Sequence, residues 1–277
     1  MARPLARLTA TDHAKLTRAV TRLEKNSLVA MLARAVGRPV TALLGALPNF
    51  ANDAIQKVTK KAVLKCLRIA LNPRSPRSIF GLAAKRSKLI SGIVGGVGGL
   101  LGLPGVLIEL PVTTLLMFQS IAQIAAAEGE DLNDPTARLA CLEVFALSSD
   151  GRGPASRQDG YYKVRDDLSK SLEEASEYVL QRSSALQTGP SLLQFASFVA
   201  ARFGVLVSEE LAVAAIPVVG AVTGASLNVV FMQHFEDVAR GHFAVRALER
   251  KYGEQKIRVE FEQIRADVRR PRINSTH

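Results

Sequence analysis

Apolar residues recur along nearly the whole chain at the three- and four-residue spacing that is typical of helices. This spacing predicts helices over 5–36, 52–71, 75–89, 136–148 and 161–182, followed by further helical stretches from 190 to about 272. Alternation of apolar and polar residues, the pattern of a half-buried strand, nowhere persists for more than four or five residues. The sequence therefore predicts an all-α fold, a single large multi-helix domain.

Polar residues suited to helix capping precede several of these stretches. We expect Asp12 to cap the first helix and Asn52 or Asp53 to cap the second. The polar run EGEDLNDP at 128–135 predicts a turn that ends in a cap for the helix starting at Thr136.

Two long apolar zones stand apart from the amphipathic helices. Residues 89–127 contain a single charged residue, Glu109, and residues 211–235 contain no formal charge. Each zone has a proline-glycine elbow, which predicts a helical hairpin, and glycines at four-residue spacing, which let helix backbones approach closely. Three interpretations stay open: hairpins that enter a bilayer, hairpins buried in the core, and hairpins that insert conditionally.

We predict that these zones form an element that holds an apolar ligand or inserts into the bilayer. It comprises Gly92, Gly96, Gly99, Leu103, Pro104, Glu109, Phe118, Pro217, Gly220, Gly224 and Asn228.

Positive charge is concentrated in the first third of the chain. Of the 277 residues, which carry a net charge of +11, the first 88 hold 18 Lys/Arg and only 3 Asp/Glu. Within 54–71 the basic residues fall on one side of a helix and apolar residues on the other, as in helices that lie on membranes or on a protein core. We expect an anion-binding or membrane-binding face formed by Lys57, Lys60, Lys61, Lys65 and Arg68, extended by Lys85, Arg86 and Lys88. We do not expect nucleic acid as a partner, because neither a helix-turn-helix pattern nor stacking aromatic residues accompany the charge.

Sequence motifs of catalysis are absent. The chain contains no HExxH, no GxSxG elbow, no phosphate-binding Walker loop and no GxGxxG after a strand. Its two cysteines, Cys66 and Cys141, are 75 residues apart and form no ligand pair. We therefore expect no cofactor, no metal and no catalytic residue. The alternative is a hydrolase or metal-dependent enzyme with a site around Glu143, Tyr161, Arg165, His234 and His242.

Several longer segments resemble the EcsC family of bacterial proteins. They are GLPGVLIELP at 102–111, IAQIAAAEGED at 121–131, RQDGYYKVR at 157–165, IPVVGAVTGASLN at 216–228 and HFEDVARGHFAVRALERKYG at 234–253. The resemblance covers about residues 43–253, with Glu109 where the family pattern has an aspartate. It implies an all-helical, membrane-associated bacterial protein and supplies no reaction. The family is named after a protein encoded beside an ABC transporter, which makes a transporter subunit a further partner to consider.

These observations give one working interpretation of the whole chain. We expect a basic N-terminal helical segment at 1–50, an EcsC-like helical domain at 51–253, and a charged C-terminal helix and tail at 254–277. The expected function is that of a membrane-associated protein that binds anionic membrane lipid or another apolar small molecule. The expected location is the cytoplasmic side of the inner membrane, bound peripherally, with integral insertion of the hairpins as the alternative.

Overall fold

Helices account for nearly all of the residues that the structure, a computed structural model, describes: 7–25, 28, 31, 49–72, 103–147, 160–181, 189–214 and 217–269. Across these ranges no strand is present, which confirms the predicted all-α fold. The helices are α1 (Ala10–Lys25), α4 (Asn49–Leu71), α7 (Leu103–Ala127), α8 (Pro135–Leu147), α9 (Tyr161–Gln181), α10 (Pro190–Ala214), α11 (Pro217–Tyr252) and α12 (Glu254–Arg269). The helix predicted over 75–89 lies outside the described residues.

Local side-chain hydrogen bonds explain where two of the helices begin. The backbone N–H of Thr136 donates to Asp134 Oδ1 (2.8 Å), so Asp134 caps α8 as the polar turn predicts. At α1 the prediction was wrong by one turn, because Thr9 is the cap. Its Oγ1 accepts from the backbone N–H of Asp12 (3.2 Å), while Asp12 Oδ2 accepts from the Thr9 hydroxyl (2.9 Å).

The start of α4 also differs from the prediction. The helix begins at Asn49, the residue after Pro48, and not at Asn52 or Asp53, because nothing between Asn49 and Asp53 opposes a helix. It ends at Leu71, as the Asn72-Pro73 pair predicts.

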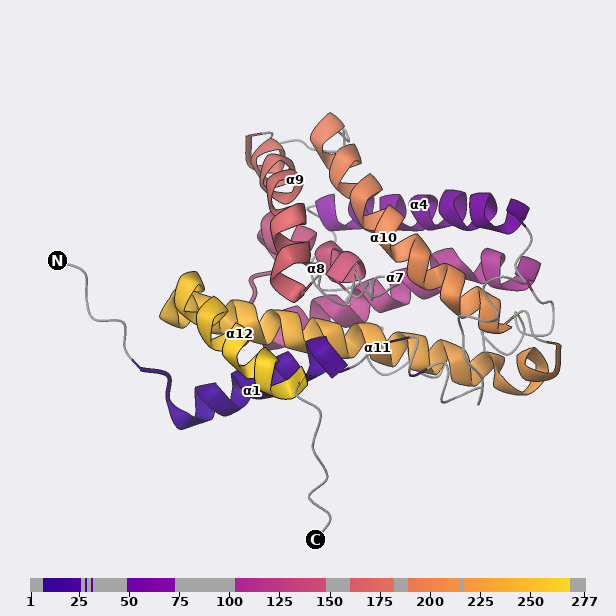
Figure 1. Cartoon of the computed structure of the whole chain (residues 1–277). Coiled ribbons are helices and arrows are strands. Elements are labelled where there is room, and N and C mark those ends of the chain that lie inside the picture. Colours follow the sequence, from indigo (N-terminus) through magenta and orange to yellow (C-terminus); the bar gives the residue numbers. More distant parts are fainter. Residues whose placement is uncertain are drawn as a thin grey trace, which may run out of the picture.

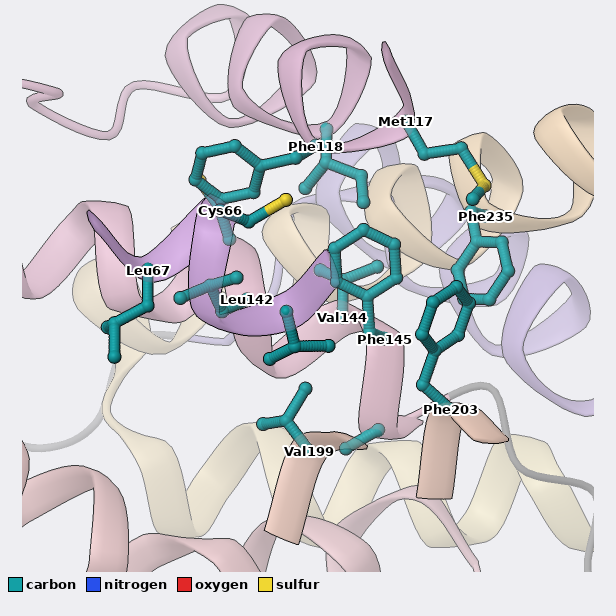
Figure 2. Packing of buried hydrophobic residues seen from close by; sticks show 14 of the residues in the cluster. Cys66, Leu67, Met117, Phe118, Leu142, Val144, Phe145, Val199, Phe203 and Phe235 are labelled. Carbon is teal, nitrogen blue, oxygen red and sulfur yellow. The ribbon is translucent and has the colours of Figure 1, made fainter. Parts of the chain in front are cut away.

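α8 lies at the centre of the fold and is covered by α4, α7, α9, α10 and α11. All ten residues from Ala137 to Ala146 are buried. Figure 2 shows Phe145 of α8 facing the rings of Phe203 from α10 and Phe235 from α11, at centroid distances of 4.8 and 5.3 Å. The main hydrophobic core is therefore built around α8.

A second, smaller hydrophobic cluster forms where α1 and α12 cross α11 (Figure 1). Ion pairs surround it: Asp12 of α1 accepts from Lys251 of α11 (2.7 Å), and Glu24 of α1 pairs with Arg265 and Arg269 of α12 (3.1 and 2.6 Å). The first and last described helices are thus held together on the same side of the molecule.

α7 and α11 run in the same direction side by side. The Ser120 hydroxyl of α7 donates to Glu236 Oε1 of α11 (2.8 Å). Ser120 lies about seven-tenths of the way along α7, and Glu236 lies just over half of the way along α11. Both helices start at the same end of the molecule (Figure 1). The two elbows, at Pro104 in the first turn of α7 and at Pro217, the first residue of α11, therefore lie at that one end.

Two described stretches, Glu109–Ala127 of α7 and Pro190–Ser208 of α10, are long and apolar enough to cross a membrane. About half of each stretch is buried inside the protein, at 50% and 56%. Core helices of soluble proteins have the same length and composition, so these stretches are a weak indication of membrane association.

Candidate functional site

The outer side of α4 carries five exposed basic side chains. We call this set, Lys57, Lys60, Lys61, Lys65 and Arg68, the basic face of α4. Within the part of the chain that the structure describes, none of the five takes part in an ion pair. Basic residues on other helices do pair: Lys15 lies 2.6 Å from Glu128, and Arg258 lies 2.6 Å from Asp166. Among the described residues, the basic face of α4 is therefore a patch of positive charge without an ion-pair partner.

The opposite side of α4 is already occupied by the protein core. Ile55, Val63, Cys66 and Leu67 are fully buried in the main hydrophobic cluster. Inserting this apolar side into lipid would require α4 to leave the core. The protein would then lose the free energy that it gains from burying several apolar side chains of α4. α4 can therefore meet an anionic partner only through its basic face. Lys85, Arg86 and Lys88 lie outside the described residues.

A second group of polar side chains is buried where α8, α9 and α11 meet. We call it the buried network; its members are Glu143 of α8, Tyr161, Tyr162 and Arg165 of α9, and His242 and Glu249 of α11. The Tyr161 hydroxyl lies 2.9 Å from His242 Nδ1, and Arg165 Nη1 donates to Tyr161 Oη (3.3 Å) and to Glu249 Oε1 (2.7 Å). The Tyr162 hydroxyl also donates to Glu249 Oε1 (2.8 Å), and His242 Nε2 faces Glu143 Oε2 at 3.6 Å.

Helical spacing brings these residues to the same place. Tyr161 and Arg165 are one turn apart on α9, and His242 and Glu249 are two turns apart on α11, so each pair lies on one face of its helix. Phe261 of α12 covers the tyrosines, stacked on Tyr161 at 5.2 Å and edge-on to Tyr162 at 5.1 Å. Arg165 and Glu249 keep 16% and 10% of their side chains exposed, so the network approaches solvent only at that pair.

Burial controls the ionisation of the network. It raises the pKa of Glu143 and of Tyr161, since both side chains are removed from water. Burial, together with the charges of Arg165 and Arg246, holds the pKa of His242 well below 6.5. The imidazole of His242 is therefore neutral at physiological pH.

Glu130, in the turn between α7 and α8, shows the opposite behaviour. Burial alone would raise its pKa, but hydrogen bonds and charge from Arg246 and Arg250 lower the pKa overall. Arg246 Nε donates to Glu130 Oε1 at 2.8 Å, and Arg250 donates to the same oxygen. A buried carboxylate with two arginines stays ionised, whereas Glu143 has no arginine of its own.

Four of the five residues proposed for an enzyme site thus meet: Glu143, Tyr161, Arg165 and His242. His234 does not join them. It lies two turns earlier on α11, about 12 Å along the helix axis, where it is buried and packs edge-on against Phe235 at 5.4 Å.

Sequence reasoning missed Glu249, which accepts from Arg165, and Tyr162, whose hydroxyl donates to the same Glu249 oxygen. A signal for Glu249 existed in the sequence. His242, Arg246 and Glu249 are spaced four and three residues apart, which places three polar side chains on one face of a largely apolar helix.

The residues proposed to hold an apolar ligand are only partly described. Phe118 is fully buried in the main core, and Glu109 is half-buried on α7. Leu103, Pro104 and Pro217 lie at the helix starts described above, and Gly220, Gly224 and Asn228 lie along α11, but their surroundings are outside the described part of the structure. Gly92, Gly96 and Gly99 lie outside it altogether.

The described side chains offer little for metal or thiol chemistry. Among them, no group of three or more His, Cys, Asp or Glu is close enough to hold a metal ion. Burial raises the pKa of Cys66 to about 12 and also raises that of Cys141, so neither thiol is a nucleophile.

In its described residues, the structure defines a class of all-helical protein with a central buried helix, a buried polar network and a basic surface helix without ion pairs. Comparison with protein families places it more closely: the model of the EcsC protein family matches residues 12–248, and the chain belongs to this family. No curated protein and no solved structure matched the chain.

Proposed function

We propose that this EcsC-family protein is a membrane-associated, non-enzymatic protein that binds anionic lipid. The observation that carries the proposal is the basic face of α4, five exposed side chains without an ion pair among the described residues. In this proposal α4 rests on the headgroups through its charges and keeps its apolar side in the core. The protein is then a peripheral protein of the cytoplasmic leaflet, where anionic lipid is found.

Electrostatics supports binding of useful strength. Each basic residue close to an anionic leaflet contributes about 1 kcal/mol. Five such residues together reach about 5 kcal/mol, enough for weak, reversible docking that further contacts must complete. The two elbows at one end of the molecule are the candidates for those contacts, as an apolar ligand site or an insertion element, and a transporter subunit is the candidate protein partner.

Charge reversal tests the proposal directly. With Lys57, Lys60, Lys61 and Lys65 all changed to Glu, affinity for vesicles that contain anionic phospholipid should fall by roughly a thousandfold or more, since about 4 kcal/mol is lost. Binding of the unaltered protein should weaken as salt rises, because the screening length shortens from about 10 Å at 0.1 M to about 3 Å at 1 M salt. Vesicle co-sedimentation measures both effects.

A matched pair of variants distinguishes the effect of where the basic residues lie from the effect of the net charge of the protein. Lys57 and Lys61 of α4, and Lys163 and Lys170 of α9, are all exposed, so reversing either pair changes the net charge equally. Only the α4 pair should weaken vesicle binding. Equal loss in both variants, or equal binding of the unaltered protein to neutral vesicles, contradicts the proposal.

A second candidate function is an enzyme, favoured by the meeting of Glu143, Tyr161, Arg165 and His242. A neutral histidine hydrogen-bonded to a tyrosine can act as a base. A screen for hydrolysis of ester and phosphoester substrates tests this candidate. Turnover that His242→Gln removes and the exposed control His13→Gln retains supports an enzyme, and turnover unaffected by His242→Gln excludes this site.

A further inference from the structure

Two arginines around the buried network each pair with a carboxylate, and a third carboxyl group has no arginine in an ion pair with it among the described residues. Arg165 pairs with Glu249 (2.7 Å), and Arg246 pairs with Glu130 (2.8 Å). Glu143, with 3% of its side chain exposed, is left facing His242, whose side chain is completely buried. Glu143 Oε2 and His242 Nε2 lie 3.6 Å apart, and neither atom has a hydrogen-bond partner in the part of the chain that the structure describes.

The hydrogen bonds of Tyr161 settle which nitrogen of His242 carries hydrogen. An arginine can only donate, so the oxygen of Tyr161 accepts from Arg165. Among the described residues, His242 Nδ1 is the one acceptor within hydrogen-bond distance of the Tyr161 hydroxyl, so the hydroxyl donates to it and Nδ1 is the nitrogen without hydrogen. The hydrogen of the neutral ring is therefore on Nε2 and points at Glu143.

Burial, the largest influence on both groups, opposes a charge on either member of the pair, whereas the surrounding charges act in both directions: the arginines lower the pKa of Glu143, and Glu130 and Glu249 raise it. From α9 the pair is faced by Arg165 and Tyr161, from α11 by Arg246 and Glu249, and from the α7–α8 turn by Glu130. The two arginines oppose a positive charge on His242. A negative charge on Glu143 would be a buried carboxylate with no ion-pair partner of its own, which is costly.

We propose that Glu143 and His242 together hold a single titratable proton in the folded protein, and that the pair is a pH-sensitive joint between α8 and α11. The proposal rests on the buried network alone. It does not depend on lipid binding or on enzymatic activity.

The proposal fixes how this pair makes stability depend on pH. In the unfolded chain, where Glu143 and His242 have their usual pKa values of 4.5 and 6.5, the pair holds two protons below pH 4.5, one between these values and none above pH 6.5. In the folded protein it holds one proton throughout, since burial raises the pKa of Glu143 and lowers that of His242. Stability falls as the pH rises where the folded state binds more protons than the unfolded state, and it falls as the pH drops where the unfolded state binds more. The contribution of the pair is therefore flat from pH 4.5 to 6.5, and the folding equilibrium constant drops tenfold per pH unit on either side.

Two single variants should change this profile in opposite directions. Glu143→Gln leaves only the histidine, so the decline above pH 6.5 should disappear and an acid decline should begin already at pH 6.5. His242→Gln leaves only the carboxyl group, so the acid decline should disappear and stability should fall as the pH rises above 4.5. Urea unfolding of full-length protein across this pH range measures the profiles, with the exposed His13→Gln as control.

A profile of Glu143→Gln that runs parallel to that of the unaltered protein above pH 6.5 overturns the proposal. A second measurement needs no variant at the pair. Nitrogen-15 NMR of histidine-labelled protein should show a neutral His242 ring, with hydrogen on Nε2, that does not titrate across about pH 5 to 8. Titration of His242 with a midpoint near 6.5 also overturns the proposal.

Discussion

At the scale of single residues, Gly241 and Gly204 both lie inside helices, but a Cβ atom would meet different neighbours at each. At Gly241 of α11 it would lie 2.7 Å from Leu23 Cγ and 3.2 Å from the backbone oxygen of Ala19, both on α1. At Gly204 of α10 it would lie 2.7 Å from the amide end of Gln56, an exposed and flexible side chain on α4. The first position needs glycine for close helix contact, and the second does not.

We therefore expect the same substitution to have opposite signs at the two positions. Gly204→Ala should raise the free energy of unfolding by up to about 1 kcal/mol, since alanine is the better helix former. Gly241→Ala should lower it by about 1–3 kcal/mol, because α1 must move away from α11. Urea unfolding of the two variants measures both, and similar changes in the two would show that α1 does not pack closely at Gly241.

At the scale of helices, the sequence was sufficient for several of the described elements but only partly for the site. Periodicity and capping residues predicted α8, α9 and α12 to within a few residues, because those signals are local. The capping role of Asp12 was misassigned, since Thr9 and Asp12 are both suited to helix starts and only the backbone geometry separates them.

The buried network depends on how helices far apart in the sequence come together. Glu143, Tyr161, Arg165 and His242 were selected as polar residues in or near apolar runs, and helical spacing within α9 and α11 is visible in the sequence. Which face of α11 meets α9 is decided by the packing of the whole core. The exclusion of His234 and the inclusion of Glu249 could therefore not be predicted.

The attachment of α1 should be sensitive to acid. Hydrogen bonds from Lys251, Tyr252 and Thr9 lower the pKa of Asp12 from 3.8 to about 2. Because the unfolded chain takes up this proton first, the stability that Asp12 contributes is complete above pH 3.8 and is lost as the pH falls toward 2. Asp12→Asn should therefore be less stable than the unaltered protein above pH 3.8, and the difference should shrink below it. Urea unfolding in acid measures this, and a constant difference would contradict the ion pair with Lys251.

At the scale of the whole molecule, charge is distributed unevenly between paired and unpaired sites. The ion pairs described above join α1, α11 and α12 to one another and to the α7–α8 turn, whereas the basic face of α4 has no partner within the described residues. Charge on the first group holds helices together, and charge on the basic face of α4 has no such role among the described residues.

The central position of α8 has a consequence for synthesis on the ribosome. Of the five helices that cover it, α9, α10 and α11 follow it in the chain, so the apolar residues 137–146 emerge before most of their cover has been made. A growing chain that stops once α9 has left the tunnel should expose α8, be cut readily by proteases and bind chaperones. One extended until α11 has emerged should resist cleavage. Limited proteolysis of stalled nascent chains measures the change, and resistance before α10 has emerged would mean that α4, α7 and α9 cover α8 without the later helices.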